Sequence, residues 1–247
     1  MKTIIIAAGQ GSRLWETTDR VPKTLLPLGN GTVLSRIVAN FASVGVNEFV
    51  LVVGFRSEFI VGYLERNSHF GKRFTIVENR EWERGNGISV LRAQAALAPG
   101  ETALLSMSDH LVSSVALARI KDAAGDRNLL LTDDRIAEVF DLGDATKVKA
   151  ENGTIVDIGK ELADYNALDC GIFRINARFF AALREQIARG RESISDAVQV
   201  LVQSRDMGIV EFPADARWID VDTPEAYRHV LAHLGEFEST GGERNRA

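Results

Sequence analysis

The first half of the chain alternates short apolar runs with segments of helical periodicity, and this alternation limits the available folds more than any other feature. The four apolar runs lie at 3–6, 48–54, 73–79 and 102–108. The first run is apolar or β-branched on both faces, which is typical of a strand that helices cover on two sides. Such an order predicts an α/β, doubly wound, mostly parallel sheet, whose ligands bind beyond the carboxyl ends of the strands.

The segments between these runs carry helix start and stop signals. Thr32 can cap a helix, a shorter helix follows Ser57, and a third helix over 88–98 is stopped by Pro99 and Gly100. We expect these helices to serve as right-handed crossovers between parallel strands.

After about residue 135 the pattern changes. Asn152 and Gly153 form a strong turn signal, which predicts a β-hairpin over 146–159, with a further strand at 167–175 beside it. The remaining expected elements are helices over 177–188 and from Ser193, a strand at 208–214, and a last helix with Thr223 as its cap and Pro224 in its first turn.

Charge and composition exclude several classes of function. The chain has 247 residues and a net charge of −5, which argues against nucleic acid or an anionic membrane as the main partner. It contains no apolar stretch long enough to span a membrane, and its first residues are too short an apolar run for a signal peptide. The single cysteine, Cys170, excludes an internal disulfide and a multi-cysteine metal site and is expected to pack in a strand. We therefore expect a cytoplasmic protein.

The loop after the first strand has the composition of a phosphate-binding turn. It reads AAGQGSRL over 7–14. Gly9 and Gly11 remove side chains where main-chain N–H groups could approach a ligand closely, and Arg13 and Lys23 add positive charge. These residues favour a polyphosphate ligand.

Two common phosphate-binding motifs do not fit this loop, but a third pattern does. The string G-x-x-x-x-G-K-[ST] is absent, and Leu14 stands where a dinucleotide fingerprint needs its third glycine. The pattern A-A-G-x-G-[ST]-R-L, followed by Pro22 and Lys23, resembles the signature of nucleotidyltransferases that join a nucleoside triphosphate to a phosphorylated sugar or alcohol. The resemblance implies the Rossmann-like nucleotidyltransferase fold with a small β-hairpin insertion on the acceptor side.

The resemblance extends to about residue 235 and is greatest to the CTP:inositol-1-phosphate cytidylyltransferases. The stretches that carry it in the second half are GDATKV, IVDIGKEL, YNALDCGIF and WIDVDTPEA. It implies a single domain over 1–235, with an NTP-binding half at 1–134 and an acceptor-binding half at 135–235. We expect the polar tail 236–247 to be disordered.

The chemistry of the transfer accounts for the opening loop. A phosphomonoester attacks the α-phosphorus in line and expels pyrophosphate, so positioned donors and cations do most of the work. We expect the Arg13 guanidinium to bind the departing pyrophosphate and the Lys23 ammonium to contact the α-phosphate. The main-chain N–H groups for the triphosphate would come from Gly9, Gln10, Gly11 and Ser12.

Such a reaction needs Mg²⁺, which carboxylates bind. Asp109 follows a buried strand, and Asp220 and Asp222 lie on the same side of a strand before the last helix. The family match assigns Asp109 and Asp222 to the metal, with Asp220 as the alternative. His110 pairs with no nucleophile in the sequence, and no role is assigned to it.

The resemblance also assigns residues to the base and the acceptor. The base would lie against the backbone of Ala7, Ala8 and Gly9 and beside Asn86, Gly87 and Ser89. Lys160 would contact the acceptor phosphate, unless it is a solvated strand-end lysine, with Lys147 near it. The groups available to hydrogen-bond a polyol are Asp144, Glu161 and Asp169.

The function expected from these residues is Mg²⁺-dependent transfer from CTP to a small phosphorylated alcohol, inositol-1-phosphate, giving a CDP-alcohol and pyrophosphate. The alternatives are a glucose- or mannose-1-phosphate nucleotidylyltransferase, a phosphocholine or aminoethylphosphonate cytidylyltransferase, or a non-catalytic regulator that binds a nucleotide sugar. Phosphocholine would require an aromatic cage for its quaternary ammonium. The candidate residues for such a cage are Tyr165 and Trp218, which are far apart in the sequence. A homo-oligomer is left open.

Overall fold

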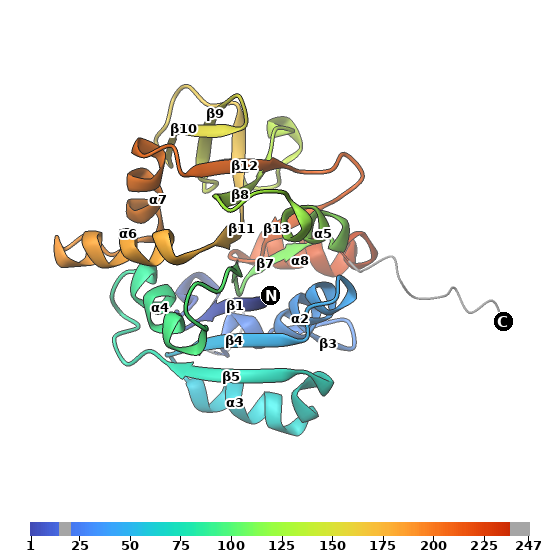
Figure 1. Ribbon diagram of the computed structural model, residues 1–247. Helices are drawn as coiled ribbons and strands as arrows, with labels where there is room; N and C mark the ends of the chain where they lie inside the picture. The colour runs from blue at the N-terminus through green and yellow to red at the C-terminus, as the bar shows by residue number, and fades with distance from the viewer. Residues whose placement is uncertain (15–20, 238–247) are drawn as a thin grey trace.

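One nine-stranded sheet runs through the computed structural model, which describes residues 1–14 and 21–237 (Figure 1). Its order is β5 (Arg73–Glu78), β4 (Glu48–Val53), β1 (Lys2–Ala7), β6 (Ala103–Met107), β11 (Ala167–Ile175), β8 (Asn128–Asp133), β12 (Met207–Glu211), β10 (Thr154–Gly159) and β9 (Lys147–Glu151). Among these described strands, the pairings set β11 and β10 against the direction of all the others. The predicted mostly parallel sheet is therefore confirmed.

Helices cover both faces of the sheet, as the sequence of β1 predicts. Ile5 and Ala7 point into one core, whereas Ile4 and Ile6 point into the other, because side chains alternate along a strand. The first core is completed by α2 (Val33–Ser43), α3 (Ser57–Arg66), α5 (Ser114–Asp122) and α8 (Pro224–Ala232). The second is completed by α4 (Asn86–Ala93), α6 (Ala177–Ala188) and α7 (Ile194–Gln203), which lie together on the left of the sheet in Figure 1.

The expected helix caps are present. The side chain of Thr32 accepts a hydrogen bond from the Ser35 N–H at 3.2 Å, and that of Thr223 accepts one from the Ala226 N–H at 3.1 Å. The helix expected over 88–98 starts earlier, at Asn86, and its last turn is a separate 3₁₀ helix, Gln94–Ala96.

The hairpin is confirmed, with β9 and β10 antiparallel around Asn152 and Gly153. Both turn residues have positive φ, 50° and 73°, which is the backbone that a two-residue hairpin loop requires. The strand β11 pairs with β9 as well as with β6 and β8, so the hairpin is joined to the central sheet. The role of this hairpin on the acceptor side stays a prediction.

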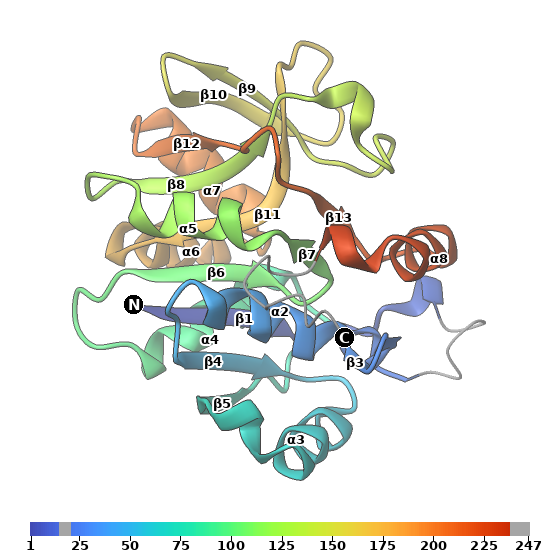
Figure 2. The ribbon, with the colours of Figure 1, turned by 90° about the vertical axis from the view of Figure 1, so that its right-hand side faces the viewer.

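The strand expected before the last helix ends at Asp220, so Asp222 lies beyond it. Several other elements were not expected from the sequence. The strand β7 (His110–Val112) pairs with β13 (Trp218–Asp220), and Figure 2 shows this pair between the end of β6 and α8. The others are β2 (Pro27–Leu28), β3 (Gly31–Thr32), α5 and β8. The β7–β13 pair matters most, because it brings two distant acidic segments together.

The expected boundaries inside the chain have different outcomes. The strand β11 lies between β6 and β8, so the sheet is continuous across residue 134 and the division into two halves stays a prediction. The expected tail starts too early. Glu236 ends a 3₁₀ helix, and Phe237 is 4% exposed in the first core, because apolar contacts hold it there. The rest of that tail, 238–247, lies outside the described residues.

Among the helices in the described ranges, none combines the length and apolarity that crossing a membrane would require.

Candidate active site

A cavity of about 340 Å³ opens beyond the end of β6, beside the β7–β13 pair. It is lined by segments from both parts of the sequence, including the loop after β8 and the start of α8. Its charged lining residues are Asp109, Asp141, Asp144, Asp169, Asp220, Asp222, Arg13, His110 and Lys160. The location agrees with the general rule that ligands of such sheets bind at the carboxyl ends of the strands.

Lys23 lies between two of the acids. Its Nζ contacts Asp109 and is 2.8 Å from Oδ1 of Asp222. Gly11, at φ +60°, makes room for it, because a Cβ there would stand 3.0 Å from the Lys23 side chain. Burial alone would lower the pKa of Lys23, but the charges of Asp109 and Asp222 outweigh burial and hold it above its ordinary value. Lys23 is therefore a fixed cation.

Asp109 is held in place by backbone as well as by charge. Its carbonyl accepts a hydrogen bond from the Val221 N–H at 2.9 Å, which ties the turn after β6 to the segment before α8. Burial would raise the pKa of its carboxyl, but Lys23 and His110 together hold that pKa well below its usual range. Asp109 is therefore ionised at neutral pH.

Arg13 and Lys160 meet at Asp144, which joins the opening loop to the hairpin. Arg13 Nη1 is 2.7 Å from Oδ2 of Asp144 and 2.7 Å from Oδ2 of Asp222, and Lys160 Nζ is 2.6 Å from Oδ1 of Asp144. Hydrogen bonds from Lys160 and Arg13 lower the pKa of Asp144, so its carboxylate stays charged. The two cations thus converge on one anionic group.

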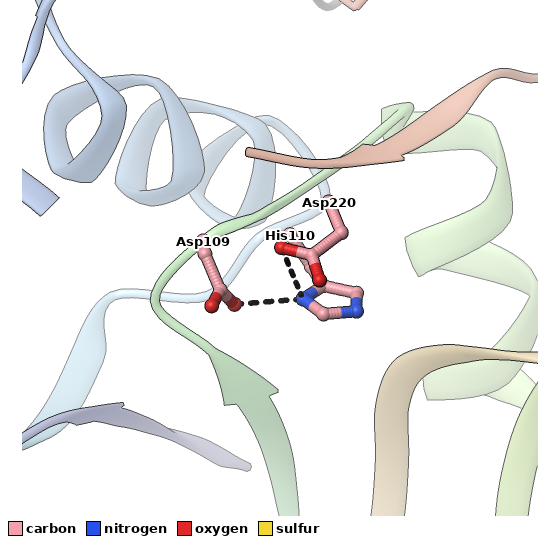
Figure 3. Close-up of side chains that lie close together, drawn as sticks. All are labelled: Asp109, His110 and Asp220. Carbon is pink, nitrogen blue, oxygen red and sulfur yellow. Dashed lines mark hydrogen bonds and ion pairs between the residues drawn. The ribbon is translucent and has the colours of Figure 1, made fainter. Parts of the chain in front are cut away.

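His110 lies beside both Asp109 and Asp220, as Figure 3 shows. Its Nδ1 is 2.7 Å from Oδ1 of Asp109 and 3.8 Å from Oδ1 of Asp220. Burial lowers the pKa of His110, but Asp220 and Asp109 outweigh it and raise the pKa to about 9. Burial and the charge of Asp109 raise the pKa of Asp220 to about 6. The position of Asp220 opposite His110 depends on the β7–β13 pairing, which gives no local sequence signal.

The contacts form one continuous series of alternating sign. Its order is Lys160, Asp144, Arg13, Asp222, Lys23, Asp109, His110 and Asp220. We call this series the charge chain. The structure therefore brings together both expected catalytic cations, all three expected metal ligands and Lys160.

The acids of the charge chain fit a divalent cation. Ligand atoms of Asp144, Asp220 and Asp222 lie within 4.8 Å of one another. Within the described residues, Oδ1 of Asp220 is buried without a hydrogen-bond partner. Carboxylate oxygens are the ligands that Mg²⁺ takes from proteins.

The expected triphosphate loop lies at the edge of the cavity. Of the stretch 7–13, all of it described, Arg13 lines the cavity. Ala7 and Ala8 are buried, and the Ala8 carbonyl accepts a hydrogen bond from the Phe55 N–H at 3.0 Å. Gly9 and Ser12 are exposed, whereas Gln10 and Gly11 are half-buried. The roles of these residues in nucleotide binding stay predictions.

The segment expected at the base is packed against the loop before α7. Asn86 lines the cavity, and its Oδ1 accepts a hydrogen bond from the Ile194 N–H at 2.9 Å. A Cβ on Gly87 would stand 2.6 Å from the Glu192 carbonyl oxygen, so this close backbone approach requires glycine. Ser89 is 3% exposed and accepts a hydrogen bond from Asn79. These contacts hold the segment in place, and the roles of Asn86, Gly87 and Ser89 beside the base stay predictions.

The acceptor-side residues are divided between the cavity and its surroundings. Asp169 lines the cavity and accepts a hydrogen bond from the Gly171 N–H at 2.7 Å. Lys147 donates to the Lys160 carbonyl at 2.7 Å and is not among the described lining residues. Lys147 is therefore placed to support the Lys160 backbone.

Comparison with known proteins gives a consistent set of similarities. The model of the MobA-like NTP transferase domain matches residues 3–138. The chain is 34% identical over 225 residues to the "Bifunctional IPC transferase and DIPP synthase" of Rubrobacter xylanophilus, covering 91% of this chain and 50% of that protein. It is 32% identical over 231 residues to the protein of the same name from Aquifex aeolicus, covering 94% and 51%. The chain thus spans about half the length of these relatives.

A solved structure, the inositol-1-phosphate CTP transferase from T. maritima, has the same fold. The two superpose with a TM-score of 0.83 at 24% sequence identity, over 96% of this chain and 97% of that one. The nucleotidyltransferase fold expected from the sequence is therefore confirmed.

We predict that Asp169→Asn stabilises the protein at pH 8 and not at pH 4. Burial raises the pKa of Asp169 from 3.8 to about 6, so the folded state loses stability as the pH rises through this interval. The asparagine removes this cost and keeps an oxygen for the Gly171 N–H. We expect a gain of about 1–3 kcal/mol at pH 8, because one pKa unit corresponds to about 1.4 kcal/mol.

Urea unfolding at the two pH values measures this gain. The control is Glu151→Gln at the exposed end of β9, which should change stability by less than about 0.5 kcal/mol at either pH. Equal stability of Asp169→Asn and the unaltered protein at pH 8 would contradict the prediction.

Proposed function

The chain belongs to the family of MobA-like NTP transferase domains. We propose that it transfers a cytidylyl group from CTP to inositol-1-phosphate, giving CDP-inositol and pyrophosphate. The names of the similar proteins support CTP and inositol-1-phosphate as the two substrates. The observation that carries the reaction type is the charge chain, in which Arg13 and Lys23 contact Asp109 and Asp222, two acids that line the cavity.

Arg13 and Lys23 would stabilise the phosphoryl charge that develops during transfer. They contact the two oxygens of the same carboxylate, Asp222, so both already point at one anionic group. Lys23 has a side chain that is only 17% exposed, and a cation with little water around it acts more strongly on a nearby charge. We assign Arg13 to the pyrophosphate and Lys23 to the α-phosphate, with the backbone of 9–12 on the triphosphate.

Asp109 and Asp222 would hold Mg²⁺, with Asp220 in reach of the same ion. The buried Oδ1 of Asp220, which has no hydrogen-bond partner among the described residues, supports this assignment. When bound, Mg²⁺ would neutralise triphosphate charge. The acids themselves hold Lys23 and Arg13 at the cavity before substrate arrives.

The acceptor phosphate would bind where Asp144 now lies. Lys160 contacts this carboxylate, and a phosphate offers it the same negative charge with more oxygens. Asp144 and Asp169 could then accept hydrogen bonds from the hydroxyls of a polyol. In this proposal the half at 135–235 binds the acceptor and the half at 1–134 binds CTP.

Phosphocholine is a second candidate acceptor because aromatic rings line the cavity. They belong to Phe140, Phe173 and Trp218, and a quaternary ammonium binds to such faces. Tyr165, the other aromatic residue suggested by the sequence, is not among the described lining residues.

We predict that pyrophosphate release is fastest with CTP and inositol-1-phosphate and that it requires Mg²⁺. A coupled pyrophosphate assay would measure kcat/KM for CTP, UTP, GTP and dTTP with four acceptors. These are inositol-1-phosphate, glucose-1-phosphate, phosphocholine and aminoethylphosphonate. Preference for dTTP or GTP with glucose-1-phosphate would move the protein to the sugar-nucleotide enzymes. If no pair of nucleotide and acceptor releases pyrophosphate, the remaining alternative is a non-catalytic regulator that binds a nucleotide sugar.

We predict that Lys23→Met lowers kcat by about 10²–10³, because a preorganised donor to the transition state contributes that much. Methionine keeps the length of the side chain and removes its charge. The control is Lys72→Met, since Lys72 bonds Asn47 away from the cavity. Circular dichroism and thermal melting check that both variants fold. A kcat within twofold of the unaltered enzyme at saturating CTP would refute the role of Lys23.

We predict that Lys160→Ala raises the KM for the acceptor about tenfold or more and leaves the KM for CTP unchanged. A hydrogen bond to a charged group contributes about 1.5–3 kcal/mol. Lys149→Ala is the matched control, because Lys149 lies on the same hairpin and pairs with Asp164 outside the cavity. Equal acceptor KM values in the two variants would remove Lys160 from the acceptor site.

A further inference from the structure

We propose that His110 is a positioning residue that orients the carboxylates of Asp109 and Asp220 for a divalent cation, an inference that rests on the proposed function. Figure 3 shows its imidazole facing both acids. The Nδ1–H donates to Oδ1 of Asp109 at 2.7 Å and faces Oδ1 of Asp220 at 3.8 Å. Because Asp109 is acceptor-only when ionised, the proton must lie on Nδ1.

The contact with Asp109 defines the orientation of that carboxylate. Its Oδ2 contacts Lys23 and its Oδ1 accepts from His110, so each oxygen has a different donor. The Oδ1 of Asp220 lacks a hydrogen-bond partner among the described residues, and Nδ1 of His110 lies 3.8 Å from it. The imidazole therefore stands where it can set the separation of the two acids.

The ring itself cannot turn away, because it is enclosed on two sides. Gly171 has φ +71°, and a Cβ on it would stand 2.3 Å from Cδ2 of His110, so the ring occupies the space that glycine leaves. The indole of Trp218 stacks on the ring, with centroids 6.1 Å apart and planes 9° from parallel. The imidazole is thus held between β11 and β13.

Trp218 is in turn anchored at the end of β8. Its Nε1–H donates to Oδ2 of Asp133 at 2.9 Å, and Asp133 is 2% exposed. Arg135 donates to the same carboxylate, with Nη2 2.8 Å from Oδ2 and Nε 2.9 Å from Oδ1. A network in which each polar group has its partner is rigid. The end of β8 therefore fixes the position of Trp218, and Trp218 fixes the position of the His110 ring beside the acids.

These contacts differ from those of a histidine that only fills the core. A histidine that only fills the core would bond a backbone group or water, and it would not restrict the rotamers of Asp109 and Asp220. His110 lines the cavity and bonds a carboxylate that we assign to the metal. Partners that orient ligand residues in this way change metal affinity by about 10–100-fold when they are removed.

The test is a titration of the full chain with Mn²⁺ alone, in which electron paramagnetic resonance measures the free ion. His110→Phe keeps a ring beside Trp218 and removes the donor, and we expect it to raise the Kd about 10–100-fold. His110→Asn can place an amide N–H near the position of Nδ1, and we expect it to restore most of the affinity. His69→Asn removes an imidazole that does not line the cavity and should leave the Kd unchanged.

Three results would overturn the inference: a Kd for His110→Phe equal to that of the unaltered protein, equal weakening in His110→Asn, or no Mn²⁺ site that Asp109→Asn removes. If His110→Phe does not fold, Trp218→Phe replaces it. That variant keeps the stack, loses the bond to Asp133, and should still weaken Mn²⁺ binding, while an unchanged Kd would count against us. The titration involves no turnover, so His110-dependent Mn²⁺ binding without pyrophosphate release would refute only the proposed function.

Discussion

Six carboxylates line one cavity, and their mutual repulsion is the constraint on which the arrangement of the site depends. In the described part of the chain, Lys23, Arg13 and His110 each bridge two of these acids. The bridges cross the fold, because they connect the opening loop, the turn after β6, the loop before the hairpin and the start of α8. Replacing Asp144, Asp222 or Asp109 therefore changes the partners of two basic groups at once. The charges hold the cavity walls together as well as preparing them for a ligand.

The same arrangement couples the binding of anions and cations in the proposed reaction. A triphosphate that takes Arg13 and Lys23 leaves Asp222 without these two cations and leaves Asp109 with His110 alone. Carboxylates at 14–19% exposure that lose a cation are costly, and a divalent cation removes that cost. A triphosphate or a metal alone would leave one set of charges unmatched. The charge chain thus favours their arrival together, as a metal–nucleotide complex.

Local sequence patterns predicted most of the fold, because strand and helix periods, caps and the Asn152–Gly153 turn act over a few residues. The motif of the opening loop is contiguous in sequence and drew attention to Arg13 and Lys23, whereas Asp109 and Asp222 were assigned by family resemblance. The roles of all four residues stay predictions. The β7–β13 pair and the role of His110 were missed for the opposite reason. Both depend on residues more than a hundred positions apart, and a strand of three residues has no readable period. The packing of Gly87 against the Glu192 carbonyl likewise joins residues more than a hundred positions apart, and the role of Gly87 beside the base stays a prediction.

Two glycines with positive φ give a second view of how the charge chain is built. Gly11 lies against the Lys23 side chain, and Gly171 lies against the His110 ring, where a Cβ would stand 3.0 Å and 2.3 Å away, respectively. The sequence pattern assigns Gly11 to a loop whose main-chain N–H groups could bind a phosphate. In the fold, Gly11 also makes space for the Lys23 side chain. A Cβ at Gly171 would overlap the His110 ring that bonds Asp109, and a Cβ at Gly11 would crowd the Lys23 side chain that contacts the same acid. The lack of a side chain at these two positions thus leaves space for both basic groups that contact Asp109.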